Sequence, residues 1–292
     1  MELVHTIPEV RRRVAAARQK GKRVGFVPTM GYLHEGHLRL IDRCRERADY
    51  CVVSVFVNPT QFGPGEDYER YPRDLERDRR LLKERGVDLV FAPDVAEMYP
   101  EEPFIRFQIE KLADHLCGPR RPGHFSGVLL VVAKLFHIVQ PDVAVFGQKD
   151  LQQLLLIRRM VRDLNFPLEI VAGPTVREPD GLAMSSRNAY LSPEERRQAT
   201  VLYRSLQRAK ELVQEGERSA RNVREAMRAM IESTPGARID YIEIVDLEEL
   251  QPVERLEGRV AIALAVHVGP ARLIDNLVLE IRGDDVREIP AI

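Results

Sequence analysis

The sequence predicts an α/β protein with a doubly wound parallel sheet, followed by a smaller α+β domain. Two observations carry this prediction. Short, almost continuously apolar runs alternate with amphipathic helical patterns through the N-terminal part of the chain, as is typical of parallel strands covered on both faces. Nearer the C-terminus, two helical patterns precede strands that are spaced like hairpins.

The N-terminal strands and helices follow in a regular order. Residues 23–27 predict a first buried strand, which Pro28 ends, and a helix is expected over about 37–48. The alternation continues with strands at 51–57, 89–91, 143–146 and 168–171, and with helices at about 73–85, 127–139 and 151–163. This order predicts a Rossmann-like domain spanning residues 1–188.

The pattern changes after about residue 188. Ser192 followed by Pro193 is typical of a helix start, so one helix is expected to about residue 214 and a second over about 220–233. Strands are expected at 239–245, 260–268 and 272–281. These elements predict an α+β domain spanning residues 189–292, which we expect to pack against the first domain.

The composition limits the class of protein. The 292 residues include 44 Lys and Arg against 45 Asp and Glu, and a net charge of −1 provides no global positive field for nucleic acid. The three cysteines lack CxxC spacing, which argues against a disulfide framework and a structural zinc site. No apolar run reaches the roughly 18 residues of a membrane span, and the N-terminus lacks a secretion-signal pattern. We therefore expect a cytoplasmic protein that binds neither nucleic acid nor membranes.

The segment after the first strand contains the first candidate site, because open α/β sheets bind ligands beyond the carboxyl ends of their strands. There His34 and His37 flank Gly36 at an expected helix start. The amides and dipole at such a start favour an anion, and imidazoles could stabilise charge on a phosphate. Two other interpretations stay open: a metal-ligand pair, and a helix cap with one surface histidine. No GxGxxG or GxxxxGK loop occurs.

Two further segments could contact phosphates. Lys149 and Asp150 follow the strand at 143–146 and open a helix, where the lysine could bind a phosphate. A plain capped helix explains this spacing equally well. Residues 185–187, two serines and an arginine, could bind triphosphate oxygens, although an ordinary interdomain loop is favoured when this segment is taken alone.

Several motifs occur together in one order. They are Pro28-Thr29-Met30-Gly31, the HxGH box His34-Glu35-Gly36-His37, VNPTQF at 57–62, YPR at 71–73, RPGHF at 121–125, GQKDLQQ at 147–153 and the stretch 177–188. With these motifs the sequence resembles the pantothenate synthetase (pantoate–β-alanine ligase) family of the nucleotidylyltransferase superfamily, which is related to class I aminoacyl-tRNA synthetases. HxGH alone is only moderately specific, but the resemblance spans nearly all of the first domain.

The resemblance implies roles for individual residues. Catalysis is implied for His34, His37, Lys149 and Arg187, with His37 as the usual proton donor, and pantoate or β-alanine binding for Gln61, Gln153 and the nearby Asn58. ATP binding is implied for three segments: Met30, Gly31, Tyr32, Leu33, His34, Glu35, Gly36 and His37; Gly147, Gln148, Lys149 and Asp150; and Val176 with Met184, Ser185, Ser186 and Arg187, the counterpart of the KMSKS loop.

The resemblance also implies the reaction. The pantoate carboxylate would attack the α-phosphorus of ATP, giving pantoyl adenylate and pyrophosphate, and the β-alanine amine would then form pantothenate and release AMP. Mg²⁺ would be carried on the phosphates, and the chain would form a homodimer. Neither step needs a protein nucleophile, and the sequence shows no Ser-His-Asp or Cys-His pattern.

Other functions remain open at this point. The HxGH box is shared with nucleotidylyltransferases that act on a phosphate ester, and a tRNA-linked synthetase fragment or a non-catalytic nucleotide-binding module are further alternatives. No protein ligand of Mg²⁺ is identified. Asp74, Glu76 and Asp78 are candidates, but a solvated helix face explains them better. His124 lies within RPGHF and receives no role.

Overall fold

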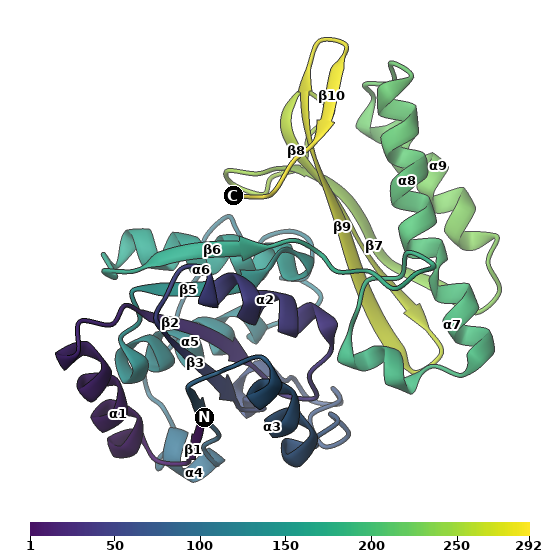
Figure 1. Cartoon of the computed structure of the whole chain (residues 1–292). Helices are drawn as coiled ribbons and strands as arrows, with labels where there is room; N and C mark the ends of the chain where they lie inside the picture. Colours follow the sequence, from purple (N-terminus) through teal and green to yellow (C-terminus); the bar gives the residue numbers. More distant parts are fainter. The chain divides into compact units, whose positions relative to one another are not determined.

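The computed structural model describes all 292 residues, which form two compact units (Figure 1). Unit 1 comprises Met1–Ile109, Arg121–Gly147 and Gln153–Gly173, and unit 2 comprises Glu110–Arg120, Gln148–Gln152 and Pro174–Ile292. Two short segments, at 110–120 and 148–152, therefore belong to unit 2 although the chain on either side of them belongs to unit 1.

Unit 1 is built on a six-stranded sheet with the order β1-β4-β3-β2-β5-β6. All neighbouring strands are parallel. The order reverses between β2 and β5, which is the arrangement of a doubly wound sheet, so this prediction is confirmed. The strands are β1 (Glu2–Val4), β2 (Val24–Thr29), β3 (Tyr50–Val55), β4 (Leu89–Phe91), β5 (Val143–Gly147) and β6 (Glu169–Gly173).

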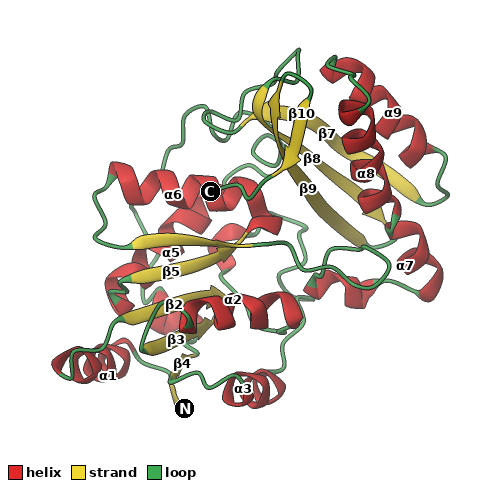
Figure 2. Ribbon diagram, turned by 45° about the horizontal axis from the view of Figure 1, so that its top comes forward, coloured by secondary structure: helices red, strands yellow, loops and turns green.

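Helices cover both faces of this sheet (Figure 2). On one face, Leu38, Leu82 and Val145 of β5 belong to one buried hydrophobic cluster. On the other, Phe136 contacts Phe146 edge to face, since consecutive strand residues point to opposite faces. The helices are α1 (Ile7–Gln19), α2 (Glu35–Arg45), α3 (Leu75–Glu84), α4 (Val95–Met98), α5 (His124–Val139) and α6 (Leu151–Asp163), with a 3-10 turn η1 (Pro59–Gln61).

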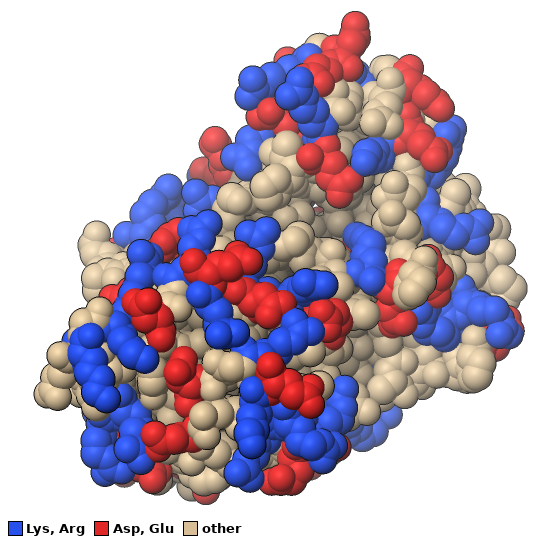
Figure 3. Space-filling view, in the orientation of Figure 1, with Lys and Arg blue, Asp and Glu red and all other residues tan.

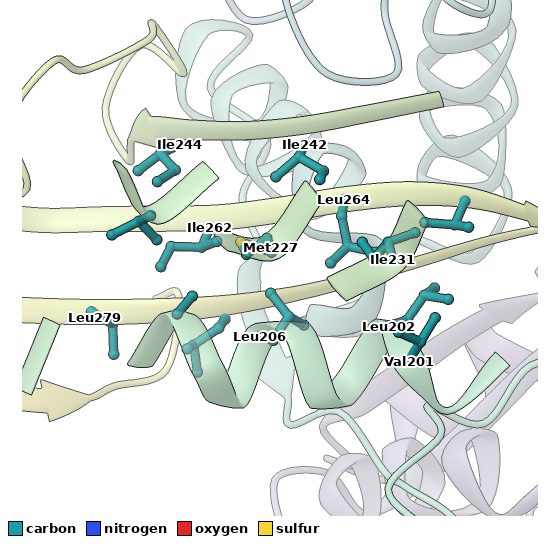
Figure 4. Close-up of a cluster of buried hydrophobic side chains, with 14 of the residues drawn as sticks. Val201, Leu202, Leu206, Met227, Ile231, Ile242, Ile244, Ile262, Leu264 and Leu279 are labelled. Atoms are coloured by element: carbon teal, nitrogen blue, oxygen red, sulfur yellow. The ribbon is translucent and has the colours of Figure 1, made fainter. Parts of the chain in front are cut away.

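Unit 2 contains an antiparallel sheet with the order β10-β9-β8-β7. Its core lies between this sheet and two helices, where Leu206 and Met227 pack with Ile262 and Leu264 (Figure 4). This arrangement confirms the predicted α+β part. The elements are η2 (Gln148–Asp150), η3 (Ser186–Tyr190), α7 (Pro193–Ala199), α8 (Val201–Gln214), α9 (Ala220–Glu232), β7 (Ala237–Asp246), β8 (Gly258–Val268), β9 (Ala271–Arg282) and β10 (Asp285–Glu288).

Some elements differ from the prediction. Strands β1 and β10 and helix α1 were not predicted, although Thr6 and Glu9 form a capping box that is readable as T-x-x-E. The single helix expected to residue 214 is two helices that meet at Thr200. Helix α5 begins at His124, because Gly123 has a φ of 81° and cannot continue a helix.

The surface carries mixed charge. On the face shown in Figure 3, lysines and arginines are interspersed with aspartates and glutamates, so the net charge of −1 reflects intermixed charges of both signs. No helix combines the length and the apolar character that crossing a membrane would need.

Candidate active site

The turn between β2 and α2 brings His34 and His37 together. The Nδ1 atom of His34 accepts a hydrogen bond from the amide of Gly36 at 3.2 Å, and Nδ1 of His37 accepts one from the amide of His34 at 3.3 Å. The ring centroids lie 4.0 Å apart. The pair is a capping box in which imidazoles replace the usual serine and glutamate. Both histidines therefore cap α2.

The capping box determines which nitrogen of each ring carries the proton. A nitrogen that accepts a hydrogen bond is unprotonated, so the neutral rings of His34 and His37 carry their proton on Nε2. Each ring thus has an N–H donor beside the positive end of the α2 dipole. This arrangement suits an anion such as a phosphate.

A buried carboxylate from α3 holds the same turn. Asp78, which is 1% exposed, accepts hydrogen bonds from the amides of Tyr32 at 2.7 Å and Leu33 at 2.8 Å. Burial raises the pKa of Asp78, an effect that these two hydrogen bonds only partly oppose. The solvated-face interpretation is wrong for Asp78, whose oxygens bind backbone amides within the protein.

The backbone of this turn needs such support. Gly31 and Tyr32 both have positive φ, 80° and 50°. A Cβ at Gly31 would lie 2.8 Å from Cγ1 of Val55 and 3.0 Å from Oδ2 of Asp78. Only glycine fits at position 31, and Tyr32 adopts a conformation that L-residues disfavour.

The side chain of Glu35 points to arginines rather than to the histidines. Its carboxylate lies 3.1 Å from Nε of Arg39 and 3.0 Å from one terminal nitrogen of Arg85. The other terminal nitrogen of Arg85 lies 2.7 Å from Asp42. These ion pairs connect the start of α2 to the end of α3. The carboxylate of Glu35 is therefore occupied within the protein.

The turn after β3 positions Gln61. Asn58, 1% exposed, donates from Nδ2 to Oε1 of Gln61 at 3.1 Å and to the carbonyl of Gly127 at 3.3 Å, and its Oδ1 accepts from the hydroxyl of Tyr99 at 2.9 Å. Nε2 of Gln61 donates to the sulfur of Met30 at 3.2 Å. Asn58 therefore uses its amide inside the protein. It orients Gln61 toward residues 30–37, the turn between β2 and α2 that carries His34 and His37 (the histidine turn).

The RPGHF motif supports Gln61 from its backbone side. Nδ1 of the buried His124 donates to the carbonyl of Gln61 at 2.8 Å, and its Nε2 accepts from Arg121 at 2.9 Å. Arg121 also donates from Nε to Glu66 at 2.8 Å. Burial raises the pKa of Glu66, but the hydrogen bonds and charge of Arg121 outweigh burial, so the pKa lies below its ordinary value.

The remaining predicted residues divide between the units. Gln153 lies in the first turn of α6 in unit 1, and Gly147 ends β5 beside Gly173. Unit 2 holds the other predicted ATP-binding residues. Gln148, Lys149 and Asp150 form η2, and Ser186 and Arg187 lie in η3 after Ser185. Just before them, the amide of Met184 donates to the carbonyl of Val176 at 3.0 Å. Ser185 caps η3 by accepting from the amide of Arg187 at 3.3 Å.

Comparison with known proteins decides the family. Residues 2–278 match the family described as pantoate-beta-alanine ligase. This chain belongs to that family. It is 60% identical over 281 residues to the pantothenate synthetase of Moorella thermoacetica, and the match covers 96% of this chain and 99% of the relative. The pantothenate synthetase of Pelotomaculum thermopropionicum is 57% identical over 279 residues, with coverages of 96% and 99%.

Solved structures of pantoate-beta-alanine ligases agree. A pantothenate synthetase from Thermus thermophilus is 54% identical with a TM-score of 0.90, and the match covers 95% of this chain and 99% of that one. A ligase from Francisella tularensis, complexed with beta-gamma ATP and beta-alanine, is 34% identical with a TM-score of 0.78 and coverages of 94% and 97%. The predicted family, fold class and ligase activity are confirmed.

Sequence reasoning missed two residues that shape the first unit of this pantoate-beta-alanine ligase. Asp78 lies in a charged helix between two arginines, and nothing in that pattern distinguishes it from a surface residue. His124 had a signal, its place within RPGHF. The ligase has no group of three or more His, Cys, Asp and Glu side chains arranged to hold a metal ion.

Proposed function

We propose that this ligase joins pantoate to β-alanine through a pantoyl adenylate, with the phosphate chemistry centred on His34 and His37. The observation that carries this proposal is the capping box of two imidazoles. It supplies two Nε2–H donors at the positive end of α2, close to the turn that bears Gln61. These donors would stabilise negative charge that develops on the α-phosphate during substitution.

We assign the remaining predicted residues to charge neutralisation and to substrate binding. Lys149 and Arg187 would contact phosphates and the departing pyrophosphate as cations, with Ser185 and Ser186 as hydrogen-bond donors. No protein nucleophile is required, because the pantoate carboxylate and the β-alanine amine are the nucleophiles. His37 would act as the proton donor.

Gln61 and Gln153 would hold pantoate. Asn58 already occupies Oε1 of Gln61, whereas Nε2 of Gln61 faces only a thioether sulfur, which is a weak acceptor. That amide group is therefore available to donate to a pantoate oxygen, and the apolar side chain of Met30 beside it suits the gem-dimethyl group. Asn58 would act on pantoate through Gln61.

Several properties of the protein belong to the same proposal. Because the acidic and histidine side chains form no metal site of their own, Mg²⁺ would enter with ATP, bound to phosphate oxygens. Phe104 and Ile105 are 91% and 74% exposed, which supports contact with a second copy in a homodimer. We also propose a cytoplasmic enzyme that binds no nucleic acid and no membrane, with residues 1–188 catalytic and residues 189–292 a lid.

A direct assay tests the reaction. With ATP, Mg²⁺, pantoate and β-alanine, mass spectrometry should detect pantothenate and AMP in equal amounts, and omitting β-alanine should leave bound pantoyl adenylate. Replacing pantoate by a phosphate ester tests the alternative nucleotidylyltransferase function. Pyrophosphate release that requires the phosphate ester and ignores pantoate would contradict the proposal. Replacing Gln61 by alanine should raise the KM for pantoate far more than the KM for ATP.

A substitution at His34 can separate capping from chemistry. Serine is a good N-cap residue, so His34→Ser should keep α2 stable, whereas His34→Ala should cost about 1 kcal/mol. Both variants lose the imidazole and should form adenylate more slowly by orders of magnitude, as should His37→Ala. A His34→Ser enzyme with near-native adenylate formation would show that His34 only caps the helix.

A further inference from the structure

Strand β9 contains two neighbouring polar residues inside an otherwise apolar stretch. Asp275 and Asn276 are only 2% and 4% exposed. Because consecutive residues of a strand point to opposite faces, their side chains leave the strand on opposite sides. Leu277, on the same face as Asp275, belongs to the core beneath the helices of unit 2, whereas Val278 shares the face of Asn276.

Asp275 binds a short hairpin at residues 176–184, in which Arg177 pairs with Ala183 and which precedes η3. Its two oxygens accept from the guanidinium of Arg177 at 2.6 and 3.0 Å, a bidentate pair. The same guanidinium donates to the carbonyl of Gly181 at 3.1 Å and lies 4.4 Å from the ring centroid of Tyr203. Asp275 thus fixes this hairpin. Its last residue, Met184, is followed directly by Ser185, which caps η3.

Asn276 binds the other predicted ATP-binding segment. Its Nδ2 donates to the backbone carbonyls of Gln148 at 3.0 Å and Lys149 at 2.9 Å. The side chain of Gln148 accepts in turn from the amide of Ala291 at 3.1 Å. These bonds hold the lysine turn η2 within unit 2, although the strand before it and most of the helix after it belong to unit 1.

We infer that Asp275 and Asn276 are positioning residues for ATP: one strand sets the spacing between the lysine turn, residues 148–150, and the serine–arginine turn, residues 185–187. The inference rests on the proposed function, in which both turns contact ATP. Buried polar side chains cost free energy unless they are hydrogen-bonded, and leucine or valine would serve the core of this strand better. The carboxylate of Asp275 and the Nδ2 group of Asn276 are instead bonded to segments that carry predicted phosphate contacts, while Oδ1 of Asn276 is buried without a hydrogen-bond partner.

The test compares each residue with an apolar neighbour on the same face of β9. Asn276→Ala is paired with Val278→Ala, and Asp275→Asn with Leu277→Ala. For each variant, thermal melting, the KM for ATP and for pantoate, and the affinity for β,γ-methylene-ATP by calorimetry are measured. Asn276→Ala and Asp275→Asn should raise the KM for ATP about tenfold, with the KM for pantoate unchanged. The two controls should lower the melting temperature without this selectivity.

Particular outcomes would overturn the inference. The inference fails if Asn276→Ala and Asp275→Asn bind the ATP analogue as tightly as the unaltered enzyme does. It also fails if these variants raise the KM for ATP and the KM for pantoate equally. Asp275→Asn keeps the shape of the side chain. If Asn276→Ala does not fold, the affinity of Asp275→Asn for the ATP analogue is sufficient to test the inference. If the unaltered enzyme binds the analogue but makes no pantothenate, the proposed function fails. Weaker analogue binding by the two variants would still support the inference.

Discussion

Replacing Asp78 by asparagine tests whether the histidine turn needs its buried carboxylate. Asparagine has nearly the same shape, but it offers one acceptor oxygen in place of two. The amides of Tyr32 and Leu33 now lie 2.7 and 2.8 Å from the two carboxylate oxygens. In Asp78→Asn one of these amides would face an NH₂ group and lose its partner.

The size of the effect follows from the one hydrogen bond that the turn loses in Asp78→Asn. A hydrogen bond to a charged group contributes about 1.5–3 kcal/mol, and that is the loss expected at the turn. Global stability should fall by less, because the substitution also removes a charge whose burial raises the pKa of Asp78. The turn itself has positive φ at Gly31 and Tyr32, so a weaker anchor should let the histidines move. A displacement near 1 Å lowers activity about 100-fold.

The assay is single-turnover formation of pantoyl adenylate, measured beside urea denaturation. Asp74→Asn is the matched control, because Asp74 caps the same helix, its Oδ1 accepting from the amide of Arg77 at 2.9 Å, and does not touch the histidine turn. We expect the control to lose some stability and no activity, and Asp78→Asn to lose activity out of proportion to its stability.

The pH dependence gives a second readout of Asp78. Because folding raises the pKa of Asp78, the native state binds this proton more tightly than the unfolded chain does. The stability of the unaltered protein should therefore fall as the pH rises from the ordinary value of 3.8 through the raised pKa. Asp78→Asn should lack this component. Native adenylate formation in Asp78→Asn would refute the reasoning, whatever its stability.

Two further substitutions test the turn that carries Gln61. Gly127→Ala should destabilise the protein by about 1–3 kcal/mol and raise the KM for pantoate, because the new Cβ would lie 2.1 Å from the carbonyl oxygen of Thr60. Glu66→Gln should lower stability in urea near pH 7, and its difference from the unaltered protein should shrink as the pH falls below 4.5. Burial raises the pKa of Glu66, but Arg121 more than offsets this, so the contribution of the pair is present above 4.5 and is lost as the pH falls through the lowered pKa.

The sheet of unit 1 could be predicted because its strands are buried on both faces. Strands β3 and β5 are apolar runs, and such runs are visible without an alignment. Strand β1 has three residues, of which one is exposed and one is buried, so it provides no periodic pattern. The break between α7 and α8 was missed because no glycine or proline stands beside Thr200 to mark it, and α7 buries only Ala199.

The candidate site was predictable only in part. His34, His37 and Gln61 lie in local motifs, which can be recognised in a single sequence. Contacts such as Asp78 with Tyr32, or Asp275 with Arg177, join residues far apart in the chain, and no local spacing reveals them. Asp275 and Asn276 nevertheless left a signal, since two adjacent polar residues interrupt an apolar strand on both of its faces.

Polar burial in this fold is concentrated on the segments assigned to substrates. Thr29 and Asp78 accept from amides of the histidine turn, Asn58 holds the side chain of Gln61, and Asn276 holds the lysine turn. Each of these side chains is at most 9% exposed. Burying a polar group is unfavourable unless it is bonded, so a core selected for stability alone would contain few of them. Their placement indicates that rigidity of the turns proposed to bind substrates, rather than stability of the core, accounts for these residues.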